Sequence, residues 1–195
     1  MKKPSQTDDD FFKKACYIEA GLVLVALALG WLANINPFEN LHFSESAILY
    51  GLIGTMPLFV MFLALEYMQI ESIVKIKKML LETLGPGLYQ CHWTDVFMLS
   101  AIAGLSEELL FRGVIQPWMA SSWGYATGLV ASNIVFGLVH AVTPLYAVVA
   151  TLVGVYLSMS MNYGGDHELL IPITIHGFYD FLALQALLRS YRLGN

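Results

Sequence analysis

Long apolar stretches alternate with short polar ones along the 195 residues of this chain. A membrane-spanning helix needs about 20 mostly apolar residues, because the hydrocarbon core is about 30 Å thick and each helical residue rises about 1.5 Å. Six stretches meet this requirement, near residues 15–34, 46–65, 93–117, 120–142, 144–161 and 169–188. The pattern predicts an all-α, polytopic transmembrane bundle that forms a single domain over residues 1–195.

A polar stretch from Glu66 to Cys91 separates the second predicted span from the third. Its apolar residues recur at a spacing that indicates an amphipathic helix lying on the membrane surface. These residues are Ile70, Ile73, Val74, Ile76, Met79 and Leu80. The Gly85-Pro86-Gly87 sequence then predicts a turn before the third span.

The first apolar segment allows two interpretations. It follows Lys13 and Lys14 and contains Ala26-Leu27-Ala28, which also fits a cleaved signal peptide. The apolar run continues through Leu32, whereas the apolar region of a signal peptide is usually only about 7 to 15 residues long. We therefore expect a retained helix.

Basic residues near the ends of the apolar stretches predict the orientation of the chain. They are Lys2, Lys3, Lys13, Lys14, Lys75, Lys77, Lys78, Arg189 and Arg192. Six spans place all of them on one side of the membrane, and short basic connections face the cytoplasm. We therefore expect both termini to be cytoplasmic.

Composition agrees with this interpretation and excludes some partners. The chain is 57% hydrophobic and 13% charged, whereas a soluble domain carries about 25% charged residues. The net charge of −5 provides no basic surface for nucleic acid. Two cysteines, Cys16 and Cys91, are too few for a disulfide framework, and we expect both to be reduced apolar fillers.

The third predicted span carries Glu107, Glu108 and Arg112 inside an otherwise apolar segment. Charged groups in the membrane are costly, so they normally face the bundle interior and find partners. Glu108 and Arg112 are spaced i and i+4 and should pair on one face. Glu107 lies about 100° around the helix from Glu108, which leaves its carboxylate free to act on water.

A purely structural role, in which these charges only hold helices together, is about equally probable for a lone intramembrane ion pair. The second carboxylate favours a functional role, because two carboxylates facing one arginine leave a surplus negative charge. Groups perturbed in this way cluster at functional sites.

Two later spans carry further polar pairs. Phe136 and His140 share a face at i and i+4, beside small residues that favour close helix packing, namely Gly124, Gly128 and Ser132. His176 and Asp180 share a face in the last span, where the carboxylate could orient the imidazole. Taken alone, His140 is better explained as a core histidine bonded to a backbone carbonyl and Phe136 as a packing residue, and an isolated pair that holds helices together would also explain His176 and Asp180.

Together the three groups read Glu-Glu-x-x-x-Arg, Phe-x-x-x-His and His-x-x-x-Asp. In order and spacing they resemble the motifs of the CPBP intramembrane proteases, also called the Abi or CAAX-protease family, which includes Rce1-type prenyl-protein endopeptidases. The resemblance covers roughly Trp93 to Leu188, which we take as the catalytic core. It implies a protease that acts on membrane-associated proteins or peptides, and so short a chain suggests a bacterial, inner-membrane member.

The resemblance also implies roles for the motif residues. Glu107 and His140 would activate the hydrolytic water, while Glu108 and Arg112 support them, as does Phe136 by packing. His176 and the residue at position 180, commonly asparagine in the family, would stabilise the oxyanion. Asp180 departs from that pattern, because an ionised carboxylate cannot donate a hydrogen bond.

The resemblance implies a mechanism without a metal or other cofactor, but two alternatives stay open. Glu107, His140 and His176 would suit a zinc ion with one open position, although the chain has no His-Glu-x-x-His motif. A scaffold, immunity factor or transporter could use the polar groups as glue or as a proton path. The predicted boundaries also place His140 near the cytoplasmic side and Glu107 deeper, so convergence requires a shifted or broken helix.

Overall fold

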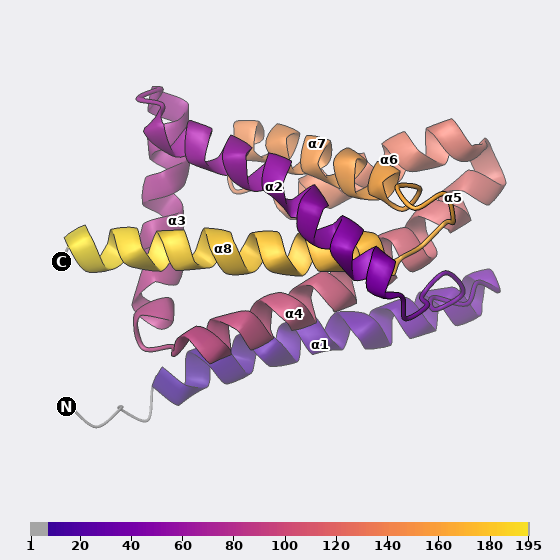
Figure 1. Ribbon diagram of the computed structural model, residues 1–195, viewed down its shortest axis with the longest axis horizontal. Helices are drawn as coiled ribbons and strands as arrows, with labels where there is room; N and C mark the ends of the chain where they lie inside the picture. Colours follow the sequence, from indigo (N-terminus) through magenta and orange to yellow (C-terminus); the bar gives the residue numbers. More distant parts are fainter. Residues whose placement is uncertain (1–7, 195) are drawn as a thin grey trace.

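The computed structural model describes residues 8–194, and every regular element in that range is a helix (Figure 1). The elements are α1 (Asp8–Ala33), α2 (Glu45–Tyr67), α3 (Glu71–Tyr89), α4 (Trp93–Leu110), the π-helical segment η1 (Phe111–Ile115), α5 (Gln116–Trp123), α6 (Tyr125–Val139), α7 (Pro144–Ser160) and α8 (Leu170–Gly194). The all-α prediction is confirmed.

Three of the described helices are long and apolar enough to cross a membrane: Phe11–Ala33 within α1, all of α2, and α8. Two shorter apolar helices, α6 and α7, lie in the segments predicted as the fourth and fifth spans. α4 continues without a break through η1 into α5. The count of six spans stays a prediction.

The long helices lie side by side, and α3 crosses one end of them (Figure 1). α8 packs between α2 and α4, and α4 packs on α1 along its other side. α6 contacts both α5 and α7. This arrangement encloses α4 and α8, the two helices that carry most of the predicted site.

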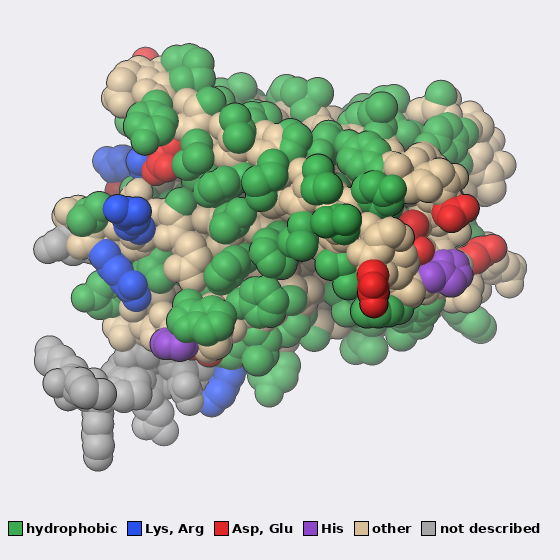
Figure 2. Space-filling model, viewed as in Figure 1, with side chains coloured by type: hydrophobic (Ala, Val, Ile, Leu, Met, Phe, Trp, Pro, Cys, Tyr) green, Lys and Arg blue, Asp and Glu red, His purple; other side chains and the backbone are tan. Residues whose placement is uncertain are grey.

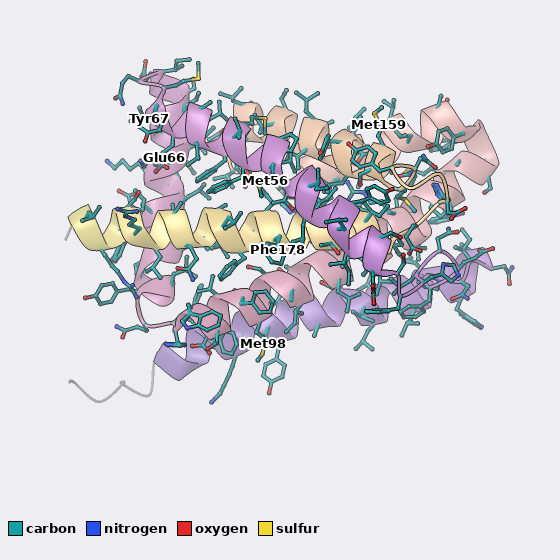
Figure 3. The ribbon with its side chains drawn as sticks, in the orientation of Figure 1. Met56, Glu66, Tyr67, Met98, Met159 and Phe178 are labelled. Carbon is teal, nitrogen blue, oxygen red and sulfur yellow. The ribbon has the colours of Figure 1, made fainter. Side chains whose placement is uncertain are left out.

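The outer surface is largely apolar. Met56, Met98 and Met159 point away from the bundle (Figure 3) and are each more than half exposed. On the face shown in Figure 2, hydrophobic side chains cover the middle of the molecule, while charged side chains gather toward its two ends. A surface of this kind fits contact with lipid rather than with water.

α4 and α8 meet backbone to backbone at two glycines. A methyl group added to Gly104 would lie only 2.7 Å from the backbone nitrogen of Gly177 and 3.0 Å from the carbonyl oxygen of Ile173. Small residues of this kind let helix axes approach closely. The contact fixes the height of Glu107 and Glu108 relative to His176.

The predicted turn at residues 85–87 is wrong, because α3 continues through it to Tyr89. Both glycines serve close packing instead. Gly85 lies against the ring of Tyr191 from α8, and Gly87 lies against the ring of Phe11 from α1, so a Cβ at either position would collide with an aromatic ring. The amphipathic helix itself is present as α3.

The predicted fourth span, residues 120–142, is wrong at its start. α5 extends to Trp123. Gly124 ends the helix with a φ of 83°, a left-handed conformation that glycine adopts readily. α6 begins only at Tyr125. Gly124 is therefore a turn residue, while Gly128 packs closely against Ala120 as a small residue should.

Candidate active site

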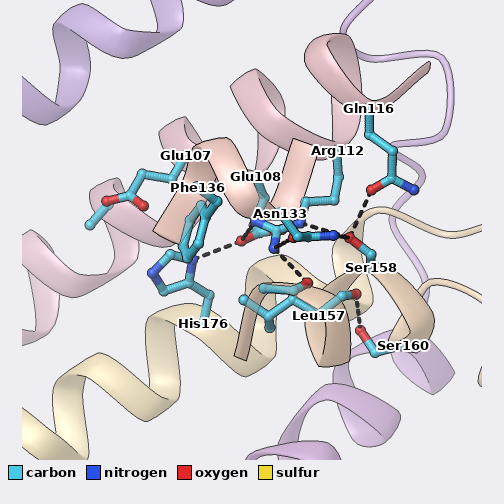
Figure 4. Close-up of polar contacts among 12 residues, drawn as sticks. Glu107, Glu108, Arg112, Gln116, Asn133, Phe136, Leu157, Ser158, Ser160 and His176 are labelled. Carbon is cyan, nitrogen blue, oxygen red and sulfur yellow. Dashed lines mark hydrogen bonds and ion pairs between the residues drawn. The ribbon is translucent and has the colours of Figure 1, made fainter. Parts of the chain in front are cut away.

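The centre of the site is a buried ion pair between α4 and η1. Arg112 donates to Glu108 Oε1 over 2.9 Å, and both side chains are almost completely buried. The same carboxylate oxygen lies 2.8 Å from His176 Nδ1 (Figure 4). Since Arg112 holds Glu108 as an ionised acceptor, Nδ1 of His176 carries the proton and donates it. Glu108 therefore orients the imidazole of α8.

Arg112 has further partners on α6 and α7. It donates to Asn133 Oδ1 over 3.0 Å, to the carbonyl oxygen of Gly154 over 2.7 Å and to Ser158 Oγ over 3.3 Å. Its guanidinium also lies over the ring of Phe136, 4.7 Å from the ring centre. The charge is thus neutralised and hydrogen-bonded, as a buried charge must be.

η1 helps to position this arginine. Its five residues, Phe111–Ile115, form a π-helical segment directly after the glutamates. π-Helical segments occur frequently at functional sites. Gly113 in this segment touches the backbone of Pro37, since a Cβ there would lie 2.6 Å from the Pro37 carbonyl oxygen. The connection between α1 and α2 therefore supports the segment that holds Arg112.

Glu107 pairs with His140 rather than with Arg112. Glu107 Oε2 lies 3.3 Å from His140 Nε2, and Nδ1 of that histidine lies 2.8 Å from the carbonyl oxygen of Phe136. A carbonyl oxygen only accepts, so Nδ1 carries a proton, and Nε2 is an acceptor when the ring is neutral. Glu107 Oε2 is buried and has no hydrogen-bond partner among the described residues. Two proton acceptors therefore face one small space.

Phe136 stands between the two histidines. Its ring centre lies 4.4 Å from that of His140 and 6.2 Å from that of His176. Phe111 of η1 meets it edge to face at 5.0 Å. Phe136 therefore packs against both imidazoles as well as covering Arg112.

Asp180 lies one turn beyond His176 on α8, and its Oδ2 is 3.5 Å from His176 Nε2. That separation is too long for a strong charge-assisted hydrogen bond. Of the two carboxylates near His176, Glu108 makes the short contact. Asp180 is also the more exposed of the two, with 31% of its side chain accessible against 0% for Glu108.

A cavity of about 400 Å³ opens onto these groups. α2, α3, α7 and α8 supply mostly apolar walls, and Glu107, His140, His176 and Asp180 are all on the lining. Lys77 and Glu66 also line the cavity and form an ion pair of 2.8 Å. The volume falls within the range of small-molecule and cofactor sites.

The depth conflict expected from the sequence disappears because α6 is short. It begins at Tyr125 and ends at Val139, and His140 is its C-terminal cap. The predicted span had run three residues further, to residue 142. In the structure His140 lies beside Glu107 of α4.

Comparison with protein families decides the broader identity. Residues 90–182 match the family described as type II CAAX prenyl endopeptidase Rce1-like. This segment, a little under half of the chain, is similar to the Rce1-like family and contains all three polar groups of the site. Searches among curated proteins and among solved structures gave no match. This similarity supports a protease, and together with the apolar helices it supports an integral membrane protein.

Sequence reasoning missed the neutral members of this site. Asn133 joins Arg112 to Ser158, since its Nδ2 donates to Ser158 Oγ over 2.8 Å. Ser158 Oγ lies 2.7 Å from Gln116 Oε1. An amide or hydroxyl in an apolar helix is a sequence signal that could have identified Asn133, Ser158 and Gln116.

Glu19 was missed as well. This carboxylate lies in α1 within the first membrane-spanning segment, and its Oε2 is 3.5 Å from Ser106 Oγ, next to Glu107. The negative charges of Glu107 and Asp180 act on it. A carboxylate inside the first predicted span was visible in the sequence, but the family motifs drew attention to the later spans.

The zinc alternative finds no ready site. In the range 8–194, no three His, Cys, Asp or Glu side chains are placed to share a metal ion. Nδ1 of His176 is occupied by Glu108, and Nδ1 of His140 by a backbone carbonyl. The Nε2 atoms of the two histidines and the carboxylates of Glu107 and Asp180 remain as possible ligands.

Proposed function

We propose that this Rce1-like protein is a glutamic-type intramembrane endopeptidase. The observation that carries the proposal is the pair of proton acceptors, Glu107 Oε2 and His140 Nε2, 3.3 Å apart on the lining of an apolar cavity. Peptide hydrolysis requires a water whose proton is removed as it attacks. A base positioned for that transfer accelerates such reactions by about 10²–10⁴-fold.

In the proposed reaction, one water molecule donates hydrogen bonds to both acceptors. Glu107 takes a proton as the water oxygen attacks the scissile carbonyl, and His140 holds the water and shares the proton. The proton then passes to the leaving amine, so the two groups act first as base and then as acid. Phe136 keeps the His140 ring in place by stacking at 4.4 Å.

The oxyanion that forms on the scissile carbonyl needs hydrogen-bond donors. His176 is proposed for this role through Nε2, while Glu108 holds Nδ1. Nε2 donates only when the ring carries both protons, and the nearby carboxylates Glu108 and Asp180 favour that state. Glu108 and Arg112 are proposed as the support that fixes His176.

The substrate is proposed to be a membrane-associated protein or peptide. A cavity with mostly apolar walls accepts a lipid chain or an apolar peptide segment, and the matching family is described as prenyl endopeptidases. A prenylated C-terminal segment is therefore the first substrate to test. Peptide leaders and apolar C-terminal tails are the other candidates.

We further propose six spans, cytoplasmic termini, a single domain over residues 1–195, and the inner membrane of a bacterium. On the face shown in Figure 2 the Lys and Arg side chains lie toward one end, where a few acidic side chains accompany them, and the other end carries acidic side chains without basic ones; this supports the orientation. Lys2 and Lys3, which entered the orientation argument, lie outside the described residues. The alignment of α3 across one end of the bundle suits a helix on the cytoplasmic surface.

The test is cleavage of a farnesylated peptide by the purified protein in lipid vesicles, with the same peptide lacking the farnesyl group for comparison. We expect hydrolysis of the farnesylated peptide, and loss of hydrolysis in His140→Ala. His167→Ala, which changes an exposed histidine in the connection between α7 and α8, is the matched control. Equal activity of His140→Ala and His167→Ala would refute the mechanism.

If no farnesylated peptide is cleaved, comparing the membrane proteome of cells that carry the wild type with that of cells that carry Glu107→Ala tests the wider substrate class. A membrane protein that is shortened only in the wild type supports proteolysis. Identical proteomes, with both proteins equally abundant, contradict it.

A further inference from the structure

The proposed mechanism has few hydrogen-bond donors where the oxyanion must form. His176 Nδ1 is engaged by Glu108, and Nε2 is a donor only when the ring is doubly protonated. Nε2 also faces Asp180 Oδ2 at 3.5 Å, and an ionised carboxylate only accepts. A neutral donor that does not depend on a second proton on His176 would meet this need.

Tyr146 carries such a donor at the right place. It lies in the first turn of α7, where its backbone N–H donates to Thr143 Oγ over 3.1 Å and fixes the start of the helix. Its side chain lines the main cavity and also a second hollow of about 360 Å³ between α3 and the end of α6. His140 lines both hollows too. Tyr146 and His140 therefore stand together where the two hollows meet.

That junction is where a bound chain would pass the catalytic groups. One part of the substrate could occupy the larger, apolar cavity and the other part the smaller hollow. A peptide bond held between them would lie beside His140 and within reach of side chains from the start of α7. A donor at this point would act on the scissile carbonyl and not on the distant parts of the substrate.

The Tyr146 hydroxyl is also free to act. Tyr146 is half-buried, and within residues 8–194 its hydroxyl makes no hydrogen bond. Glu107 and Asp180 line the same cavity as Tyr146, and their charges act on the phenol. Tyr156, on the same helix, shows the ordinary structural alternative, because its hydroxyl donates to the Gly54 carbonyl over 2.7 Å.

We propose that Tyr146 donates a hydrogen bond to the oxyanion and so supplies the donor that aspartate at position 180 does not. This role rests on the proposed proteolytic function and adds a catalytic residue to it. The bond is strongest in the tetrahedral intermediate, where the oxygen carries its charge. Tyr146 should therefore affect kcat more than KM.

The first experiment measures kcat and KM for Tyr146→Phe with the peptide that the wild type cleaves. Loss of one oxyanion donor lowers kcat by about 10²–10³-fold, and we expect a fall of that size with KM nearly unchanged. Tyr156→Phe is the matched control and should leave kcat within a few-fold of the wild type, since its hydroxyl donates to the Gly54 carbonyl of α2 and Tyr156 is not among the lining residues of the main cavity.

The second experiment changes Asp180→Asn in both backgrounds. The amide of asparagine donates hydrogen bonds, so it should replace the lost donor and shrink the effect of Tyr146→Phe by an order of magnitude or more. A merely structural role for the hydroxyl would show the same loss with either residue at position 180. Tyr179→Phe is measured alongside, because Tyr179 also lines the cavity.

Two replacements of Tyr146 that keep its size serve as a second test, in case the phenylalanine variant misfolds. 4-Aminophenylalanine at position 146 keeps a donor and should retain activity, whereas 4-methylphenylalanine lacks one and should not. The proposal is overturned if 4-methylphenylalanine is as active as 4-aminophenylalanine, or if Tyr179→Phe and not Tyr146→Phe lowers kcat. An active Glu107→Ala enzyme would instead refute the proposed function itself, so the two failures are distinguishable.

Discussion

His176 Nδ1 and Arg112 Nη1 share one acceptor, Glu108 Oε1, at 2.8 and 2.9 Å. The ion pair that braces α4 therefore also sets the orientation and the protonated nitrogen of His176. A change at Glu108 should therefore lower both stability and catalysis, although Glu108 is proposed to act through His176 and not on the substrate.

Glu108→Gln should be strongly destabilising. It removes the charge that neutralises Arg112, and leaving one partner of a buried ion pair alone costs about 3–5 kcal/mol. The measurement is the free energy of unfolding in mixed micelles. Lys78→Ala is the control, because Lys78 and Glu82 form an exposed pair whose loss should be barely measurable. Equal effects of the two substitutions would contradict the assignment of Glu108 as the brace.

Gly104→Ala should separate α4 from α8. The new methyl group meets backbone atoms of Gly177 at 2.7 and 2.9 Å, which cannot move aside as a side chain can. We expect a loss of about 1–3 kcal/mol in stability, from overpacking, and a clear loss of activity.

Gly21→Ala in α1 is the matched control for Gly104→Ala, because nothing lies within 4 Å of a Cβ added there. Alanine is about 1 kcal/mol better than glycine inside a helix, so Gly21→Ala should stabilise slightly. If both substitutions raise the melting temperature, α4 and α8 do not meet as closely as the structure has them.

Glu19→Gln should stabilise the protein. An ionised carboxylate in a membrane-spanning helix is costly, and the charges of Glu107 and Asp180 increase that cost. Glutamine keeps a polar group for Ser106, 3.5 Å away. A gain of about 1–2 kcal/mol in the free energy of unfolding is expected. A lower melting temperature would show that Glu19 has a stabilising partner or a required charge.

Metal chelation should leave proteolysis unchanged. The donor arrangement around Glu107 offers no group of three ligands in residues 8–194, and the proposed water activation requires none. Zinc content by mass spectrometry and activity after dialysis against a chelator are the two measurements. Stoichiometric zinc whose removal abolishes activity, and whose return restores it, would replace this mechanism by the zinc alternative.

Much of the site was accessible from spacing alone. Glu108 and Arg112 form the pair that an i, i+4 relation favours, because both sit on one helical face over a single turn. The short contact between Glu108 and His176 was not predictable, since it joins α4 to α8 and depends on how closely Gly104 lets them approach. The sequence instead favoured Asp180 as the partner of His176, because Asp180 lies four residues further along the same helix.

Helix ends were the weaker part of the prediction. Small residues such as Gly85, Gly87 and Gly124 suit either a turn or close packing, and only tertiary contacts decide between them. Gly124 was expected to pack and instead turns the chain, while Gly85 and Gly87 were expected to turn the chain and instead pack. The same uncertainty produced the false separation in depth between His140 and Glu107.

The most direct test of the account is the cleavage rate of purified Glu107→Gln in lipid vesicles, compared with that of the wild type. The melting temperatures of the two proteins are measured to show that the variant is folded. Glutamine preserves the size of Glu107 but cannot accept a proton from water. The account predicts a fall in kcat of at least about 10²-fold, in the range expected for loss of a general base. A Glu107→Gln enzyme that cleaves within a few-fold of the wild-type rate would contradict it.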